Sequence, residues 1–468
     1  MIYKELFYTP KPHYPKESEK YWSPELETMK PEKREKLIFK RIRAQVEYAY
    51  NKSALYHKKY KDANIRPSDI KTFKDFRKLP FITKQDLRED QRTNPPFGTN
   101  LCIPPQKIYR IHGTSGTTGK SVLFGLSRGD IARIGYEHAR AMWGAGLRYK
   151  DMMLVCTPFS LYVGGWDIMY GCQWMGVPCF PFGAGIPGQT KQICMLATEV
   201  RPTATYSTIS YAFYMAETAR SMGYEPSKDF AFRIMFFSGE AGAGRPNIKK
   251  KVREIWNAKS IDCGTTAEMA PWMSNCECEE QTGMHLWQDM VYAEVIDPET
   301  KELCDYGEEG VAVYTHMGRE SHPMIRFWSN DITRWAYEGC PCGRTYPTLP
   351  DGVYGRYDDM FKVRGVGVWS SAVENVLRGI DGFGNEFKCI VDRTKVMDTF
   401  EVVAEYNEEV AKKAEKDSKV LDKLKREMEE ELRLALGVRC DVTLKPPFTI
   451  PRTEKHKRSH IVLIGAEV

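Results

Sequence analysis

The 468-residue sequence lacks the features that mark several classes of protein. It contains no apolar run long enough to span a bilayer, and no apolar segment follows a basic start in "MIYKELFYTPKPHYPKESEKYW". We therefore expect neither a membrane protein nor a secreted one. The 68 basic and 62 acidic residues nearly balance and are spread along the chain, which argues against a nucleic-acid partner. Internal repeats and low-complexity segments are not seen either.

A disulfide framework is not indicated. The thirteen cysteines are an odd number, and most stand singly in apolar segments, as at Cys156, Cys172 and Cys389. This usage is typical of the reducing cytoplasm, which is the location that we expect.

The order of the remaining patterns predicts more than one domain. The chain is too long for a single ordinary core. Residues 16–61 predict a helical layer, residues 105–300 alternate strand and helix patterns, and residues 290–337 are rich in strand patterns. Alternation of this kind predicts parallel sheets wrapped by helices, with a barrel-like subdomain after them. The last hundred residues predict a small α+β domain with one long charged helix over 408–436.

Two local patterns predict helix details. Thr83 and Asp86 stand three positions apart at the start of "TKQDLRED", as in a capping box. Within 408–436, one apolar stripe is expected to face the core; it consists of Val420, Leu421, Leu424, Met428 and Leu432.

The segment "HGTSGTTGK" at residues 112–120 indicates an anion-binding loop. Glycine backbone N–H groups, hydroxyls and a following lysine together suit the oxygens of a triphosphate. The usual P-loop places four residues between its glycines, whereas Gly113 and Gly119 have five between them. A plain surface turn is the alternative interpretation of the same residues.

Further motifs identify the loop by resemblance. "TSGTTGK" resembles the phosphate loop of the adenylate-forming superfamily, which includes acyl-CoA synthetases. "SGEAG", "DCGTTAEMAP", "MIRFWSNDIT", "GRYDDMFKVRG" and "PRTEKHKR" follow in the order that this superfamily shows. "CECEEQTGMHLWQD", "CPCGRTYP" and "GRYDDMFKVRGVGVWSSAVENVL" are most similar to the phenylacetate–CoA ligase family, and the likeness covers nearly the whole chain.

The resemblance implies an α/β fold. It consists of a large N-terminal domain of two helix-wrapped sheets plus a barrel-like subdomain (residues 1–357) and a small mobile C-terminal α+β domain (residues 358–468). Asp358 would be the hinge between them. The implied activity is an ATP-dependent, AMP-forming ligase that converts an aromatic carboxylic acid to its coenzyme A thioester through an acyl-adenylate. ATP, Mg²⁺ and coenzyme A would be required, and a homodimer is a mild expectation.

The same resemblance assigns site residues. Lys455 is the catalytic candidate, with Lys457 as the alternative, because the family's glycine before this pair is missing here. Glu268 would hold Mg²⁺, although a gapless alignment puts Ala267 at that position. Cys263 stands where the family has tyrosine, so stacking on adenine is lost or supplied elsewhere. Nucleotide-binding roles are implied for Thr114, Ser115, Gly116, Thr117, Thr118, Gly119, Lys120, Ser238, Gly239, Glu240, Asp262, Cys263, Gly264, Thr265, Thr266, Asp331 and Arg356.

Two residues near the ribose-binding Asp331 also receive predictions. Asn330 replaces a glycine of the family, which asparagine tolerates if the backbone there is left-handed. Arg326 would either approach the phosphates or have an exposed structural role.

Two Cys-x-Cys pairs and a histidine predict a zinc site. Together they offer enough ligands for tetrahedral zinc, although reduced cysteines in tight turns give the same pattern. Similar sets in related ligases favour Cys278, His285, Cys340 and Cys342 over Cys276. All four positions would then be filled by protein, so the zinc would be structural.

Aromatic segments predict the acyl pocket. Their flat side chains suit an aromatic acid; the candidates are Phe159, Tyr162, Gly164, Gly165, Trp166, Tyr206 and Phe236. "FSLYVGG" departs from the phenylacetate ligases, so phenylacetate itself is not implied. Two other functions stay open: an adenylate-transferring synthetase that needs no coenzyme A, and a non-catalytic zinc-stabilised binding protein.

Overall fold

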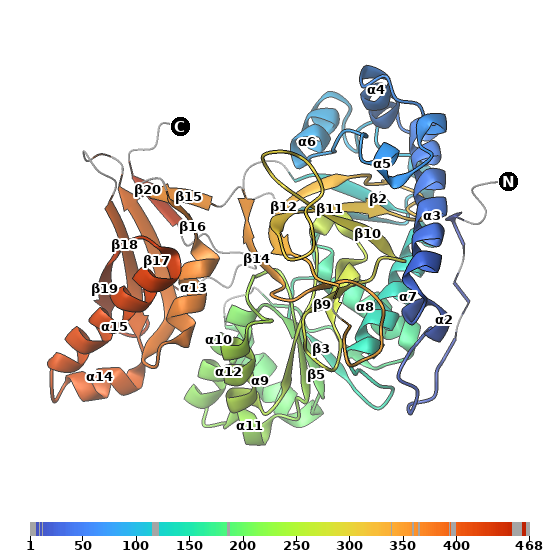
Figure 1. Cartoon of the computed structure of the whole chain (residues 1–468). Helices are drawn as coiled ribbons and strands as arrows, with labels where there is room; N and C mark the ends of the chain where they lie inside the picture. The colour runs from blue at the N-terminus through green and yellow to red at the C-terminus, as the bar shows by residue number, and fades with distance from the viewer. Residues whose placement is uncertain are drawn as a thin grey trace.

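The computed structural model describes residues 6–8, 10–11, 13–114, 121–184, 188–337, 339–357, 360–363, 366–392, 394, 399–451 and 461–464. A large N-terminal body and a smaller C-terminal one stand side by side, joined after β14 (Val353–Arg356) (Figure 1). The predicted α/β class is confirmed. Within these ranges no helix has the length and apolar character that crossing a membrane requires.

Helices from the first hundred residues lie along one side of the large body (Figure 1). The longest, α3 (Pro31–Lys52), buries Ile38, Ile42 and Val46 at four-residue spacing, which gives it one apolar face. The others are α2 (Pro24–Glu27), α4 (Ala54–Asp62), α5 (Phe73–Phe76) and α6 (Lys84–Thr93). The helical layer predicted for residues 16–61 is confirmed.

The capping box of α6 is also confirmed. The Thr83 hydroxyl accepts the N–H of Asp86 at 3.1 Å, and the Asp86 carboxylate accepts the N–H of Thr83 at 2.7 Å. These two bonds satisfy N–H groups that the start of a helix leaves without partners.

A five-stranded parallel sheet forms the centre of the large body. Its strand order is β4-β3-β5-β6-β7, and alternate residues of each strand enter different cores. On β6, Ile234 and Phe236 pack into one core, and Met235 and Phe237 pack into the other. Burial of both faces is what a parallel sheet requires. The strands are β3 (Met153–Val155), β4 (Cys179–Phe180), β5 (Ala204–Ser207), β6 (Ile234–Phe237) and β7 (Lys259–Asp262).

Helices cover both faces of this sheet. The first face carries α7 (Arg128–Gly144) and α8 (Gly164–Met175), and the second carries the helices whose apolar residues enter the other core. These are α9 (Gln189–Val200), α10 (Ile209–Ser221) and α12 (Pro246–Trp256), and the short helix α11 (Pro226–Asp229) lies between the last two in the chain.

Antiparallel strands complete the large body. A four-stranded sheet has the order β10-β11-β12-β14, in agreement with the strand-rich prediction for residues 290–337. Its members are β10 (Val291–Ile296), β11 (Glu309–His316), β12 (Phe327–Arg334) and β14. Smaller pairings join β1 (Arg110–Gly113) to β2 (Leu123–Leu126), and β9 (Met284–Leu286) to both β8 (Asn275–Glu277) and β13 (Thr348–Leu349).

The C-terminal body has a core of its own. Helix α13 (Ser370–Gly379) and the sheet β19-β18-β17-β20 enclose a cluster drawn from residues 361–442. The sheet consists of β17 (Phe383–Asp392), β18 (Thr399–Tyr406), β19 (Asp441–Lys445) and β20 (Ile461–Ile464). Strands β15 (Met360–Val363) and β16 (Val366–Trp369) form a separate pair. Strand β20 was not predicted from the sequence.

The single long helix predicted over 408–436 is wrong. Two helices, α14 (Glu408–Ala414) and α15 (Lys419–Leu436), stand in its place. The Asp417 carboxylate accepts the N–H of Lys419 at 3.0 Å, a local bond that competes with a continuous helix. Of the predicted stripe, Leu424, Met428 and Leu432 are buried, while Val420 and Leu421 are half-buried.

Helix α13 is where the two bodies meet. The Asn247 side chain of α12 donates to the carbonyl of Asn375 at 3.2 Å. The guanidinium of Arg378 lies 5.1 Å from the ring centre of Phe213 on α10, and Glu374 bonds the same guanidinium. We call Asn247, Phe213, Asn375 and Arg378 the α13 contact.

Candidate active site at the carboxyl edge of the parallel sheet

Four parallel strands end at one edge of the central sheet, and the predicted site segments follow them directly. Thr157 and Phe159 come after β3, Ser207 ends β5, Ser238 follows β6, and Asp262 ends β7. In open α/β sheets, ligands bind in the crevice outside the carboxyl ends of the strands. This edge is therefore the place for a ligand site.

The segment Ser238–Glu240 is tied to the start of α10. Ser238 donates its N–H to the carbonyl of Ser207 at 3.2 Å, and Gly239 adopts φ +85°. The Glu240 carboxylate accepts the N–H of Ser210 at 2.9 Å and its hydroxyl at 2.6 Å. Burial raises the pKa of Glu240, and Glu374 of α13 raises it further.

The segment Asp262–Thr266 is braced by β8. Asp262 donates its N–H to the Glu277 carboxylate at 3.0 Å and accepts the N–H of Gly244 at 3.0 Å. Burial and the neighbouring Glu277 raise the pKa of Asp262 well above its usual range. Gly264, at φ +123°, donates to the carbonyl of Asn275 at 2.9 Å. Thr265 donates to the carbonyl of Met269 at 3.3 Å.

Cys263 does not offer a surface on which adenine could stack. Its side chain is 2% exposed and its thiol donates to the carbonyl of Phe237 at 3.3 Å. Cys276 lies directly opposite on the neighbouring strand segment. The cysteine is therefore packed inside the sheet edge. Thr266, two positions after Gly264, carries a buried hydroxyl without a hydrogen-bond partner among the described residues.

Glu268 supplies the carboxylate of this segment, whereas its neighbour Ala267 is apolar. Both lie in a short 3₁₀ turn, and Ala267 packs against the core. The Glu268 side chain is 4% exposed, and its Oε1 lies 3.4 Å from Nζ of Lys84 on α6. Sequence reasoning missed Lys84, although it is the first residue after the predicted cap Thr83.

Asp331 and Arg356 face each other across β12 and β14. The Arg356 guanidinium donates to the Asp331 carboxylate at 3.2 Å, and Asp331 donates its N–H to the Ser329 hydroxyl at 2.9 Å. Asn330 has φ +66°, which is the left-handed backbone in which asparagine can replace the glycine of the family. Its side-chain oxygen accepts the indole N–H of Trp328 at 2.7 Å.

Arg326 is neither exposed nor directed at this edge. Its side chain is 3% exposed and pairs with Glu294 at 3.2 Å. It also donates to the carbonyl of Leu79 at 2.8 Å and to that of Arg77. Arg326 thus joins the helical layer to β10. The exposed alternative is wrong, and the bonds to distant carbonyls explain why.

The predicted acyl segments lie beside the strand ends. Gly164, Gly165 and Trp166 begin α8, and the Trp166 ring meets that of Phe159 edge-on at 5.2 Å. Tyr206 and Phe236 are completely buried in the core on that face of the sheet. The aromatic side chains thus lie on the same face of the sheet.

Of the predicted phosphate loop, the structure describes only the first residue, Thr114. Thr114 donates its N–H to the carbonyl of Val122 at 3.0 Å, and its hydroxyl accepts the N–H of Val122 at 3.1 Å. These bonds close the base of the loop. Ser115, Gly116, Thr117, Thr118, Gly119, Lys120, Asp358, Lys455 and Lys457 lie outside the described residues.

Three cysteines and a histidine form a compact donor set. The donor atoms of Cys278, His285, Cys340 and Cys342 all lie within 4.8 Å of one another. The sulfurs of Cys278 and Cys340 are 3.7 Å apart, and Cys342 Sγ is 3.4 Å from His285 Nε2. Tetrahedral zinc with bonds of about 2.3 Å to sulfur and 2.0 Å to nitrogen would hold such atoms about 3.5–3.8 Å apart. The residues fit a structural zinc ion.

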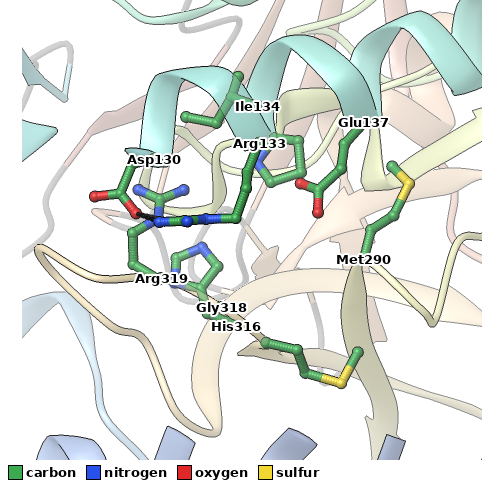
Figure 2. A pocket seen from close by; sticks show the side chains of 10 residues that line it. Asp130, Arg133, Ile134, Glu137, Met290, His316, Gly318 and Arg319 are labelled. Atoms are coloured by element: carbon green, nitrogen blue, oxygen red, sulfur yellow. Dashed lines mark hydrogen bonds and ion pairs between the residues drawn. The ribbon is translucent and has the colours of Figure 1, made fainter. Parts of the chain in front are cut away.

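A small cavity of about 20 Å³ lies between α7 and the end of β11 (Figure 2). Glu137 and His316 reach toward it from α7 and β11, with Arg133 and Arg319 beside them. Burial raises the pKa of Glu137 from 4.5 to about 8, Arg140 opposes the rise and Asp289 adds to it. Burial also lowers the pKa of His316, and Arg319 adds to this. The volume suffices for one water molecule.

Comparisons with known proteins agree with this geometry. Residues 365–462 match the family model described as AMP-binding enzyme C-terminal domain. The phenylacetate–coenzyme A ligase of Thermus thermophilus is 31% identical over 94% of this chain and 99% of its own. That of Aromatoleum evansii is 29% identical over 91% and 93%.

A solved relative matches the whole arrangement. 2-Hydroxyisobutyryl-CoA ligase in its postadenylation state superposes with a TM-score of 0.92 at 38% identity, over 97% of this chain and 94% of that one. The same ligase in its thioesterification state, at 39% identity and equal coverage, gives 0.74.

The fold and the edge site define an adenylate-forming enzyme. The chain belongs to the phenylacetate–CoA ligase family and is a carboxylate–CoA ligase that forms an acyl-adenylate intermediate.

Proposed function

We propose that this ligase activates its carboxylic acid at the carboxyl edge of the central sheet. The gathering of four strand ends at one edge of the parallel sheet, together with the facing pair Asp331 and Arg356, carries the proposal. The acid's carboxylate attacks the α-phosphorus of ATP, and pyrophosphate leaves. The thiol of coenzyme A then attacks the acyl carbon and AMP leaves. Positioning and charge neutralisation are the protein's main tasks in the first step.

Each segment of the edge has a proposed role. Residues 114–120 would hold the β- and γ-phosphates, and Asp331 would accept both ribose hydroxyls. Arg356 would contact the nucleotide while it is paired with Asp331. The segments Ser238–Glu240 and Asp262–Thr266 would border the adenine and acyl sites. Glu268, whose Oε1 has no hydrogen-bond partner among the described residues, would hold Mg²⁺.

Turning of residues 358–468 about Asp358 would let one site serve both steps. The higher TM-score with the postadenylation state than with the thioesterification state supports two domain arrangements. Lys455 would complete the first arrangement. Lys455→Ala should then abolish carboxylate-dependent pyrophosphate exchange and spare thioester formation from preformed adenylate. Normal exchange in that variant, together with its loss in Lys457→Ala, would move the role to Lys457.

Two classes of acid compete. An aryl or arylalkyl acid is the class predicted from the sequence, and relatives named as phenylacetate ligases support it. A short hydroxy acid is the second candidate, because a ligase named for 2-hydroxyisobutyrate is 38% identical over 97% of the chain. Pyrophosphate release with a panel of acids, with and without coenzyme A, tests the function. Pyrophosphate release that is independent of coenzyme A and is not accompanied by AMP would favour an adenylate-transferring synthetase.

The Cys278, His285, Cys340 and Cys342 set would hold one structural zinc ion. Its compact donor geometry and the chemistry of three thiols and an imidazole support this. Metal analysis of protein purified without chelator should find zinc at about one per chain, and finding none would remove the proposal.

A further inference from the structure

Two tyrosines, Tyr162 and Tyr206, lie together within the segments predicted to line the acyl pocket. The Tyr162 ring lies so close to Gly164 that a Cβ at that glycine would come within 2.6 Å of its Cε1 and hydroxyl. Tyr162 is 8% exposed and Tyr206 is completely buried. Their phenol groups are close neighbours, and Ser238 lies beside that of Tyr206. Gly164 thus gives Tyr162 the room to close this end of the site.

These two tyrosines lie next to the carboxyl ends of the parallel strands. Both phenols neighbour Cys263 at the end of β7, and burial raises the pKa of both, so they remain protonated donors. Phe236 beside them is completely buried. Entry of a phenyl ring at this end would therefore require one of these side chains to leave a packed position, which is costly in a dense core.

The hydroxyl of Thr157 could bind a polar substituent of the acid. Thr157 is 1% exposed, and its Oγ1 has no hydrogen-bond partner among the described residues. A Cβ at Gly165 would come within 2.8 Å of that oxygen. The first N–H groups of α8 begin here, and the N-cap residue Val163 offers no side-chain bond to them. A buried hydroxyl without a partner is unfavourable unless a ligand pairs with it.

We infer that the acid is short and carries a hydroxyl group, with Tyr162 limiting its length and Thr157 binding its hydroxyl. This inference rests on the proposed function, because it concerns the acyl side of the same edge. A site built to pair a hydroxyl rejects the analogue without it much more strongly than an apolar pocket rejects an extra methylene. Selectivity for the hydroxyl should accordingly depend on Thr157, and selectivity against bulk on Tyr162.

The wild-type enzyme provides the first test. Pyrophosphate release is measured with 2-hydroxyisobutyrate, 3-hydroxybutyrate, isobutyrate, phenylacetate and benzoate. We expect kcat/KM for the better hydroxy acid to exceed that for isobutyrate by about tenfold or more, and that for phenylacetate by about a hundredfold. A preference for phenylacetate or benzoate would overturn the inference while leaving the proposed function intact.

Variants separate the two roles. Thr157→Val keeps the volume and should lower the hydroxy-to-deoxy ratio of kcat/KM by about tenfold, whereas Thr218→Val on α10 should not change it. Tyr162→Ala should raise kcat/KM for phenylacetate about tenfold. Tyr162→Phe, which keeps the ring, should not raise it, and Tyr60→Phe serves as the matched control for loss of a buried phenol. Melting temperatures identify variants that fail to fold.

A binding measurement decides the inference if no acid turns over. Absence of pyrophosphate release with every acid would contradict the proposed function. The 2-hydroxyisobutyryl and phenylacetyl sulfamoyl-adenosine analogues are then compared by calorimetry. At least tenfold tighter binding of the hydroxyacyl analogue supports the inference, and equal or weaker binding overturns it.

Discussion

At the scale of single residues, Glu268 is the acidic side chain at the sheet edge that we assign to the metal ion. Glu268→Gln keeps the shape and removes the charge, so we expect adenylate formation to fall by about 10²–10³. Pyrophosphate exchange over a Mg²⁺ titration measures this. Glu279→Gln, which changes a more exposed acid paired with Arg148, is the control. Wild-type exchange in Glu268→Gln would contradict the assignment.

Glu137 gives the molecule a predicted pH dependence. Its pKa is raised from 4.5 to about 8 in the folded protein, so between these values the folded state binds more protons than the unfolded state. Stability should therefore fall as pH rises through this window, by about 1.4 kcal/mol per pH unit from this group alone. Asp289 adds to the rise, whereas Arg140, Arg133 and Arg319 oppose it.

Glu137→Gln tests this dependence, because glutamine stays neutral throughout. Melting temperatures between pH 5 and 8 should decline less steeply in the variant than in the wild type. Parallel declines in the two proteins would show that other groups cause the dependence.

Single residues also show how far the sequence predicts the site. Asn330 was expected to tolerate the position of a family glycine if the backbone there is left-handed, and its φ is +66°. This condition concerns one residue only and so could be stated from the sequence. Arg326 was predicted poorly, since its partners are carbonyls of residues 77 and 79 and the carboxylate of Glu294. Lys84 was missed for the same reason: its partner Glu268 lies far along the chain.

At the scale of elements, the cysteine–histidine set is linked to the adenine segment through β8. Cys278 directly follows this strand, whose Glu277 bonds the N–H of Asp262 and the ammonium of Lys249. Cys342→Ser should therefore lose zinc, lower the melting temperature and also weaken ATP binding. Metal analysis, thermal unfolding and nucleotide titration measure the three effects.

A matched control for the zinc prediction is Cys440→Ser, another buried cysteine that lies in the C-terminal core. It should retain zinc. Full zinc content in Cys342→Ser would show that this thiol is not a ligand.

Elements were predicted well where the signal lies within them. The cap of α6 follows from neighbouring residues, and so does the alternation of strands and helices over 105–300. The division of 408–436 depends instead on one local bond accepted by Asp417, within a run rich in the helix formers Lys, Arg and Glu. Strand β20 gains its place only by pairing in parallel with β17, which begins 78 residues earlier.

At the scale of the whole molecule, the α13 contact holds the two bodies in the arrangement seen here. Arg378→Ala removes the guanidinium that faces Phe213 and should destabilise this arrangement by about 1–2 kcal/mol. We expect adenylate formation to slow about tenfold while thioester formation from preformed adenylate changes less than twofold. Single-turnover measurements of each half-reaction test this.

Arg433→Ala provides the control, because it removes an exposed arginine from α15 in the same domain. Neither half-reaction should change in it. Equal losses of both half-reactions in Arg378→Ala would indicate general destabilisation and contradict a role in selecting one arrangement.

The separate core of the C-terminal body has a consequence for how such chains can be recombined. Among the described residues, its apolar cluster draws only on residues after β14, so we expect this core to keep its packing when another large domain precedes it. A hybrid that joins residues 1–357 to the C-terminal body of a related ligase should fold as two intact units. Contacts of the native protein should be lost only at the α13 contact, where Asn375 and Arg378 would face residues of a different ligase. Genetic exchange at this point would change the relative rates of the two half-reactions. Residues 1–357 would still determine which acid is used.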